Sequence, residues 1–258
     1  MAQPQDEKDE ASLPAILCLH GYGTNAAIFR YQLRHITQAL TGIFRFIFVE
    51  APFHVQQPGP GVPPGFADAG PFRRWHSDET LAGAFGVSAS NLKDEKRQVR
   101  ELLRDTLESE RRRGARGSGV VGVVAFSHGA ALGAALCLDP ELGADIKFAV
   151  IFCAMYPALS LMEDDDEGSA STAVAKPSKT SSGPRLVIEI PSIHVQGTSD
   201  PWRGQGTKTL EQYFDGTRAR RIELAGLSHE VPSKVREAAM VADEVMAVWK
   251  SDREKGEG

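Results

Sequence analysis

The stretch Val120–Leu136, VVGVVAFSHGAALGAAL, decides the fold of this chain. It begins as an unbroken apolar run rich in valine, which is typical of a strand buried on both faces. It continues in alanine and leucine, which favour a tightly packed helix. Ser127 lies between the two, with Ala125 and Gly129 two residues away on either side. A serine between small residues at a strand-to-helix turn indicates a nucleophile elbow, whose strained backbone presents the hydroxyl.

The elbow departs from the pattern Gly-x-Ser-x-Gly at one position, because Ala125 stands where the first glycine is usual. A methyl group is the mildest replacement available, so the nucleophile prediction is kept. Ser-x-Gly between a strand and a helix also occurs in phosphate-binding turns and in ordinary strand–helix connections. The rest of the chain must therefore supply a base, an acid and oxyanion donors.

Length and composition indicate a globular protein. The chain has 258 residues, of which 41% are hydrophobic, enough for one large α/β domain. Its formal net charge of −5 gives no support for a nucleic-acid partner, which favours a basic face. No apolar run approaches the ~18 residues needed to span a bilayer, and residues 1–12 contain no apolar signal segment. We therefore expect a cytoplasmic protein without a membrane span.

The cysteines indicate neither a disulfide framework nor a metal centre. Cys18, Cys137 and Cys153 each lie inside an apolar run, where a free cysteine is expected to act as a small core residue. Neither a C-x-x-C pair nor a phosphate-binding G-x-x-x-x-G-K-[ST] motif is present. The sequence therefore predicts no metal and no cofactor.

A second glycine-rich turn, HGYG at residues 20–23, follows a predicted strand over Pro14–Leu19. In α/β hydrolases a strand that ends in this way commonly supplies one oxyanion donor, because glycine lets the backbone N–H approach the substrate. A plain glycine-rich connection is the alternative. Asn25 is expected to cap a helix that runs to about Leu40.

Residues 50–80 follow a further predicted strand and are rich in proline and glycine. Proline neither donates to a strand ladder nor continues a helix, so we expect a long ordered loop or lid. Its aromatic side chains follow a strand end, which favours the wall of a substrate pocket; a small core under the loop is the alternative. These aromatic residues are Phe53, Phe66, Phe72 and Trp75.

A charged amphipathic helix is predicted over Ala89–Arg113. Its last residues, Arg111, Arg112 and Arg113, precede Gly114, and cations followed by glycine are typical of a helix C-terminus. A docking patch for an acidic partner is the alternative.

Strands and helices continue to alternate toward the C-terminus, which predicts a mainly parallel central sheet with helices on both faces. The final helix is expected to run from Pro232 to about Trp249. Residues 163–184 are acidic and then rich in Ser, Thr and Lys without apolar periodicity, so we expect a disordered insertion. We expect a single α/β domain over residues 13–250, with tails at 1–12 and 251–258.

Three groups able to act together follow three separate predicted strands: Ser127, Asp200 and His229. Loops at the carboxyl ends of parallel strands gather on one edge of a sheet, and the chain order Ser, Asp, His is that of α/β hydrolases. A serine hydroxyl needs an imidazole to take its proton, and a carboxylate orients that imidazole. Backbone N–H groups of Tyr22 and His128 are the expected oxyanion hole.

Each member of this constellation has a competitor. His229 could be a surface residue, and His20 could be the base, although it belongs to the oxyanion segment. His128 follows the nucleophile directly, so its side chain is expected to point away from the serine. Asp215 could replace Asp200, although it lies at a predicted helix end.

Five segments resemble the fungal serine hydrolases often called FSH hydrolases, and they are distributed from about residue 15 to 235. They read LCLHGYGTNAAIFRYQL, VEAPF, AFSHGAALGAAL, IHVQGTSD and LSHEVP. Within that family, AIFRYQL, APF and GPGVPPGFADAGPFRRW are similar to thioesterases of the lovastatin-pathway type. The resemblance implies the α/β-hydrolase fold and the triad Ser127, Asp200 and His229. Ala125 and the insertion at 163–184 depart from the family pattern.

The resemblance also implies a function. Such thioesterases release a polyketide from the acyl carrier domain of its synthase by hydrolysing the thioester. We therefore expect an acyl thioester or ester substrate and an acyl carrier domain as partner. A general carboxylesterase and an inactive hydrolase-fold binding protein are the alternatives, and a peptidase has nothing in its favour beyond the shared triad.

Overall fold

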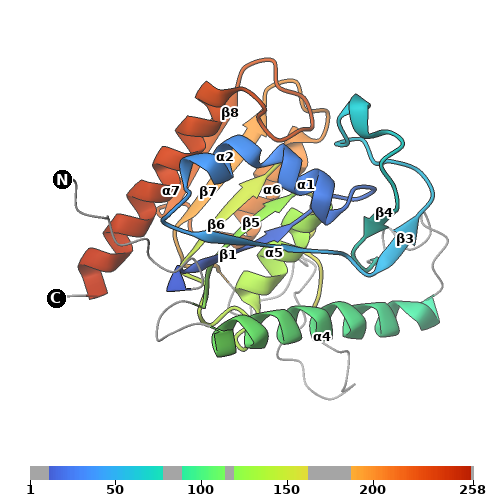
Figure 1. Cartoon of the computed structure of the whole chain (residues 1–258), viewed down its shortest axis with the longest axis horizontal. Coiled ribbons are helices and arrows are strands. Elements are labelled where there is room, and N and C mark those ends of the chain that lie inside the picture. Colours follow the sequence, from blue (N-terminus) through green and yellow to red (C-terminus); the bar gives the residue numbers. More distant parts are fainter. Residues whose placement is uncertain (1–11, 78–88, 114–118, 162–186, 257–258) are drawn as a thin grey trace, which may run out of the picture.

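A computed structural model describes residues 12–77, 89–113, 119–161 and 187–256. The predicted insertion at 163–184 and residues 1–11 of the predicted tail lie outside the described residues. A six-stranded sheet forms the centre of the molecule, and every pair of neighbouring strands in it is parallel (Figure 1). Its order is β2 (Arg45–Val49), β1 (Ala15–Leu19), β5 (Val120–Phe126), β6 (Phe148–Phe152), β7 (Ser192–Gly197) and β8 (Ala219–Leu224).

Helices cover both faces of this sheet, which confirms the predicted architecture. On one face lie α1 (Ala26–Gln32), α2 (Arg34–Ala39) and α7 (Val235–Gly256), which share one apolar core with the sheet. On the other face lie α4 (Ala89–Arg113), α5 (His128–Leu138) and α6 (Arg203–Tyr213), which share the second. Burial on both faces explains why strands such as β5 are apolar at every position. None of the described helices combines the length and the apolar character needed to cross a bilayer.

The chain changes direction across the sheet between β1 and β5. It leaves β1 toward β2 at one edge, and after α4 it returns to β5 on the other side of β1. Ligands of open parallel sheets bind outside the carboxyl ends of the strands at such a switch point. The turn at residues 20–23 follows β1 and Ser127 follows β5, so the two glycine-rich segments meet at this point.

Two predicted helix boundaries are wrong. The predicted single helix from Asn25 to Leu40 is divided at Leu33, whose ψ is 0°. Helix α7 continues to Gly256, so no tail begins at residue 251. The apolar repeat ends near Trp249, but the charged residues that follow favour helix and extend it.

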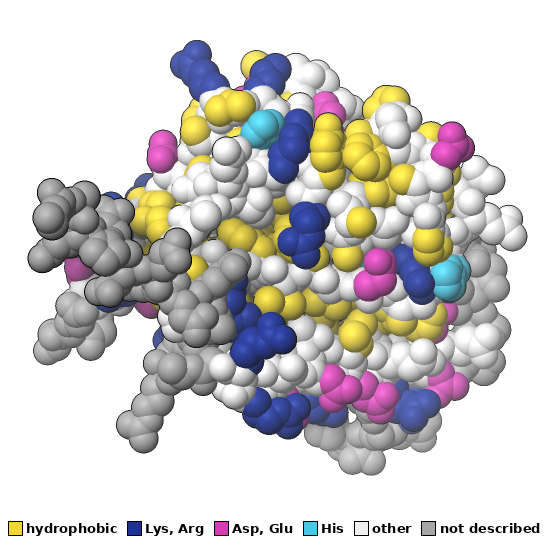
Figure 2. Space-filling model, in the orientation of Figure 1, with side chains coloured by type: hydrophobic (Ala, Val, Ile, Leu, Met, Phe, Trp, Pro, Cys, Tyr) yellow, Lys and Arg dark blue, Asp and Glu magenta, His cyan; other side chains and the backbone are white. Residues whose placement is uncertain are grey.

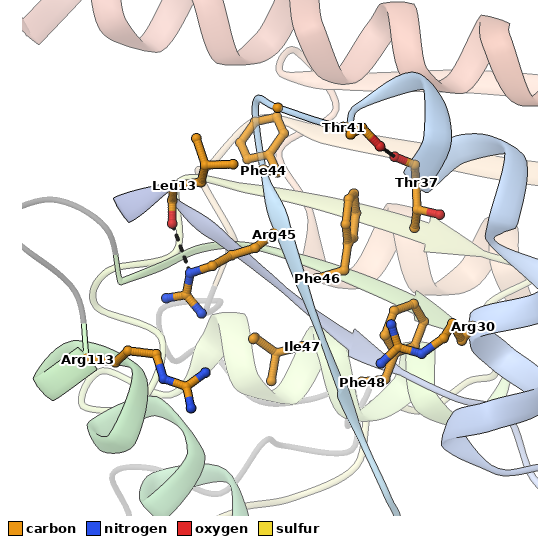
Figure 3. A pocket seen from close by; sticks show the side chains of 11 residues that line it. Leu13, Arg30, Thr37, Thr41, Phe44, Arg45, Phe46, Ile47, Phe48 and Arg113 are labelled. Atoms are coloured by element: carbon orange, nitrogen blue, oxygen red, sulfur yellow. Dashed lines mark hydrogen bonds between the residues drawn. The ribbon is translucent and has the colours of Figure 1, made fainter. Parts of the chain in front are cut away.

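Strand β2 forms an edge of the sheet, and a groove of about 620 Å³ lies along it (Figure 3). Phe46, Ile47 and Phe48 contribute apolar side chains to the groove, and Arg30 and Arg113 contribute cations from the flanking helices. The guanidinium of Arg30 lies 4.2 Å from the centroid of the Phe48 ring. Figure 2 shows apolar side chains on this face with Lys and Arg side chains beside them. Charged side chains beside an exposed strand discourage edge-to-edge pairing with another chain.

The arginines that end α4 have partners within this chain. Arg111 pairs with Asp145 at 2.8 Å, and Arg112 and Arg113 lie 3.6 and 3.9 Å from Glu108 and Glu110 of their own helix. These contacts favour the helix-end interpretation over a docking patch.

Gly122→Ala tests how tightly β5 packs. A Cβ at this position would lie 2.4 Å from the buried ring of Phe148, so the ring must move. We expect a loss of about 1–3 kcal/mol in the free energy of unfolding, measured by urea denaturation. Gly216→Ala, whose Cβ meets nothing within 4 Å, is the matched control. Equal stability of the two variants would contradict this packing.

Candidate active site

Ser127 occupies a sharp turn between β5 and α5. Its backbone has φ 55° and ψ −116°, in the left-handed region that L-residues adopt at a cost of about 1–3 kcal/mol. Its N–H donates to the Phe152 carbonyl at 3.0 Å, and α5 begins at the next residue. A Cβ on Gly129 would lie 2.3 Å from the Leu19 carbonyl oxygen, so only glycine allows α5 to approach β1 this closely.

Gly133 of α5 makes room for the methyl group of Ala125, the residue that departs from the usual elbow pattern. Ala125 is fully buried, and its methyl group faces Gly133 of α5, where a Cβ would lie only 3.0 Å from it. The helix therefore leaves room for the methyl group, and the elbow keeps its shape.

His229 links the serine to a carboxylate. Its Nε2 lies 2.8 Å from the Ser127 Oγ, and its Nδ1 lies 2.9 Å from Asp200 Oδ2. The His229 and Asp200 side chains are only 3% and 1% exposed. The Asp200 carboxylate can only accept a hydrogen bond, so the proton lies on His229 Nδ1. His229 Nε2 is then the acceptor for the serine hydroxyl. This is the geometry in which a neutral imidazole takes a proton from serine.

Hydrogen bonds tie the loops that carry Asp200 and His229 to each other. The Ser199 N–H donates to the Leu227 carbonyl at 3.0 Å, and the Gly226 N–H donates to the Thr198 hydroxyl at 2.9 Å. A Cβ on Gly197 would lie 2.0 Å from the Leu227 oxygen. The distance between acid and base is thus fixed by backbone contacts as well as by their own hydrogen bond.

Two aromatic rings contact the imidazole of His229. The Phe126 ring lies 5.2 Å from it between centroids, and the Trp202 ring lies 4.7 Å away in an edge-to-face arrangement. The backbone N–H of Trp202 also donates to Asp200 Oδ1 at 2.8 Å. Trp202 was not anticipated from the sequence, although its place two residues after Asp200 was the available signal.

The predicted oxyanion segment lies directly beside the nucleophile. A Cβ on Gly21 would lie 3.4 Å from the Ser127 Cβ, so the turn after β1 and the elbow are in contact. His128 is the first residue of α5, whose N-terminal N–H groups and dipole favour a negative charge. The position of the Tyr22 and His128 backbone supports their predicted role, which stays a prediction.

The competing residues are engaged elsewhere. The His20 Nδ1 donates to the Gly21 carbonyl at 2.8 Å while its Nε2 accepts from the Ala51 N–H at 3.1 Å, so neither nitrogen serves Ser127. Burial, followed by the charges of nearby groups, lowers the pKa of His128 to about 3, which keeps that ring neutral. The Thr217 hydroxyl donates to the Asp215 carboxylate at the surface, and this hydrogen bond lowers the pKa of Asp215.

The proline-rich loop packs onto the oxyanion segment. The Gly59 N–H donates to the Gly23 carbonyl at 2.9 Å, and a Cβ on Gly59 would lie 2.0 Å from the Tyr22 oxygen. A Cβ on Gly61 would lie 2.5 Å from the Phe126 ring, next to His229. The predicted ordered loop is thus present over residues 50–77, with a short hairpin of β3 (Phe53–Val55) and β4 (Phe72–Arg74), whereas 78–80 lie outside the described residues.

The burial of Trp75 favours the alternative of a core residue under the loop over the predicted pocket role. Trp75 is fully buried, belongs to an apolar core, and donates its Nε1 proton to the His20 carbonyl at 2.8 Å. Phe72 is also buried. The Trp75 ring packs in the core that the sheet shares with α4, α5 and α6, so it anchors the loop to the body of the molecule. Phe53 and Phe66 are half-buried, and their pocket role stays a prediction.

Among the described residues, Cys153, Asp200 and His229 are a group with three potential metal-ligand atoms, all within 4.8 Å of one another. The His229 and Asp200 atoms already bond each other, and Cys153 Sγ–H donates to the Glu230 carbonyl at 3.7 Å. This donor set therefore fits proton transfer better than metal binding.

Comparisons with known proteins agree with this geometry. The sequence profile of the family described as "Serine hydrolase (FSH1)" matches residues 11–241. The thioesterase FSL2 of Gibberella zeae is 44% identical over 93% of this chain and 94% of its own length. The esterase pigG of Monascus ruber is 34% identical over 92% of this chain and 91% of its own length.

Solved structures share the fold at low sequence identity. A carboxylesterase of Bacillus cereus has a TM-score of 0.53 at 15% identity and covers 95% of this chain and 92% of its own. The acyl-protein thioesterase 2 of Zea mays has a TM-score of 0.54 at 15% identity, with 96% of both chains covered. The chain therefore has the α/β-hydrolase fold.

Gly59→Ala tests the contact between the loop and the oxyanion segment. The added methyl group must displace the Tyr22 carbonyl, and misplacement by ~1 Å near the chemistry can cost about 100-fold in rate. We expect kcat for a small acyl thioester to fall by about 10–100-fold. Gly65→Ala, in the same loop with nothing within 4 Å of its Cβ, should behave as wild type. An unchanged kcat in Gly59→Ala would count against this contact.

Trp75→Phe separates a structural role from a pocket role. It removes the donor to the His20 carbonyl and leaves that buried acceptor unpaired, which costs about 1–3 kcal/mol of stability. We expect a lower melting temperature and a lower kcat, with the same ratio of kcat/KM for long and short acyl thioesters. A changed ratio at unchanged stability would restore the pocket interpretation.

Proposed function

Because this chain belongs to the FSH1 family of serine hydrolases, we propose that it is an acyl thioesterase that releases a polyketide from the acyl carrier domain of a polyketide synthase. The observation that carries the catalytic part is the Ser127–His229–Asp200 chain of hydrogen bonds, at 2.8 and 2.9 Å, in a buried site. The preference for thioesters is supported by the relative named thioesterase, which is 44% identical. The polyketide part rests on the sequence resemblance.

The proposed reaction has two halves. Ser127 Oγ attacks the thioester carbonyl while His229 Nε2 takes the hydroxyl proton, and Asp200 stabilises the imidazolium that forms. The backbone N–H groups of Tyr22 and His128 stabilise the oxyanion. His229 then returns the proton to the leaving thiol, which leaves an acyl group on Ser127. Water, activated by His229, releases the acid and restores the serine.

The proposal places this reaction in the cytoplasm. Cys18, Cys137 and Cys153 are all free thiols, and buried free cysteines are typical of proteins that fold in a reducing compartment.

The experiment offers a polyketide-like acyl group on a carrier domain and on a small thiol, and follows the protein by intact mass spectrometry. We expect hydrolysis, or a transient acyl adduct, with the wild-type chain and faster turnover from the carrier. Ser127→Ala should lose about 10⁴-fold or more in turnover, because the nucleophile is absent. Ser109→Ala, an exposed serine on α4, is the matched control and should retain full activity.

Other outcomes distinguish the alternatives. A higher kcat/KM for simple esters than for any thioester would favour the carboxylesterase alternative; the name of pigG describes that relative as an esterase. Equal turnover from the carrier and from the small thiol would remove the carrier domain from the proposal. If neither donor reacts and a fluorophosphonate probe leaves Ser127 unlabelled, the chain is a binding protein.

A further inference from the structure

Two arginines, Arg30 of α1 and Arg34 of α2, form no ion pair with a carboxylate of the described residues. Each guanidinium lies over an aromatic ring instead. That of Arg30 is 4.2 Å from the centroid of Phe48, as Figure 3 shows, and that of Arg34 is 4.2 Å from the centroid of Tyr31. The Arg34 Nη1 also donates to the Tyr31 carbonyl at 2.9 Å. Stacking of this kind holds a guanidinium in place and leaves N–H donors for an anion.

Exposed aromatic rings lie beside these cations. Tyr31 is 44% exposed, and its ring packs against that of Phe66, in the loop after β2, with 4.7 Å between centroids. Figure 2 shows apolar side chains gathered over α1 and this loop, with Lys and Arg side chains next to them. We call this surface the arginine–aromatic patch; its residues are Arg30, Tyr31, Arg34, Phe48 and Phe66. Tyrosine and arginine are enriched at the energetic centres of protein–protein interfaces.

The two halves of the patch are tied together. The Gln32 Nε2 of α1 donates to the Gly61 carbonyl of the loop at 2.8 Å. At the other end of α1, the Asn25 Nδ2 donates to the carbonyls of Ala69 and Pro71, at 3.1 Å in each case. A surface that is already ordered loses little conformational freedom when a partner binds. The patch is therefore preformed for docking.

The patch lies at the same edge of the sheet as the catalytic residues. Phe48 is the last residue but one of β2, near the carboxyl end of that strand. Phe29, which precedes Arg30, stacks on Phe126 with 6.5 Å between centroids, and Phe126 contacts the imidazole of His229. Helix α1 itself follows the oxyanion segment. A partner bound at the patch is thus close enough to deliver a tethered acyl group to the active site.

We propose that the arginine–aromatic patch is the docking surface for the acyl carrier domain. This rests on the proposed function and deepens it, because it states where the partner binds. A carrier domain holds its acyl thioester on a phosphopantetheine arm, whose phosphodiester is an anion next to the carrier surface. Arg30 and Arg34 bind this phosphodiester and the acidic side chains around it, since a guanidinium presents a fork of donors to phosphate or carboxylate oxygens. Tyr31 and Phe66 pack on the apolar surface beside it.

Charge favours this occupant over a second copy of the chain. Cations without carboxylate partners require an anionic partner, and a carrier with its phosphodiester supplies one. In a two-fold symmetric dimer the same patch would face itself, and it would bring the arginines of both copies together. Like charges placed opposite each other at an interface are costly. A small thiol lacks the phosphodiester, so the patch distinguishes carrier-bound from free thioesters.

The test compares one acyl group on two donors, a carrier domain and a small thiol, and measures kcat/KM for each. A double variant, Arg30→Gln with Arg34→Gln, removes both charges and keeps the polar side chains. A second double variant, Arg30→Lys with Arg34→Lys, keeps the charges and removes the fork. Arg112→Gln is the matched control, because Arg112 is a 74% exposed arginine on α4, away from the patch.

We expect kcat/KM for the carrier-bound thioester to fall about 10-fold or more in the double glutamine variant and by less in the double lysine variant. Tyr31→Ala should lower it about 5-fold, through the loss of an exposed ring. Turnover of the small thioester should stay within about 2-fold of wild type, since docking does not contribute to it. Added salt should slow the carrier reaction of the wild-type chain more than that of the double glutamine variant.

Three results would overturn the inference. One is an unchanged kcat/KM for the carrier-bound thioester in the double glutamine variant. Another is an equal fall for both donors, because the arginines would then only support the oxyanion segment. The third is a wild-type dimer, seen by sedimentation, that the double glutamine variant dissociates; the patch would then join two copies of this chain.

Failure of the proposed function is distinguishable from failure of the docking surface. It would appear in the wild-type chain, before any arginine is changed, as equal turnover from the carrier and from the small thiol, and both proposals would fall. A preference for the carrier that survives in the double glutamine variant would remove the docking surface alone.

Discussion

The contact between the start of α5 and the end of β1 is the constraint on which the active site depends. Gly129 lies against the carbonyl oxygens of Leu19 and His20 so closely that any side chain there would overlap them. This approach brings the first turn of α5 next to the oxyanion segment at residues 20–23. It also leaves Ser127 no ordinary backbone conformation in which to join β5 to the helix. Strain at the nucleophile and proximity of the oxyanion donors therefore have a single cause.

Parallel strand order converts this local contact into a complete site. The nucleophile, the acid and the base follow β5, β7 and β8, and the carboxyl ends of parallel strands lie at one edge of the sheet. Hydrogen bonds between the loops after β7 and β8, one to a backbone carbonyl and one to the Thr198 hydroxyl, then fix the distance from Asp200 to His229. Because the sheet is buried on both faces, these loops are held by a rigid support, which catalysis by preorganised groups requires.

The loop after β2 supports the oxyanion segment at residues 20–23. Its glycines at 59 and 61 allow direct contact with the oxyanion segment and with Phe126, and the indole N–H of Trp75 donates to the His20 carbonyl. Both α5 and the loop therefore hold the oxyanion segment in place. A segment with many prolines suits this task, because its unfolded chain has fewer conformations to lose.

The sequence by itself determined the fold class, the chain order of the triad and the elements that carry it. Apolar runs separated by amphipathic helices specify a buried parallel sheet, and Ser127, Asp200 and His229 could be identified because each stands just after a predicted strand. Local sequence could also favour His229 over His20. Only the tertiary structure decided which aromatic residues touch the imidazole, that Trp75 is a core residue, and that Phe66 packs against Tyr31. Those contacts join residues far apart in the chain, and their identity depends on side-chain packing, which has no periodic signature.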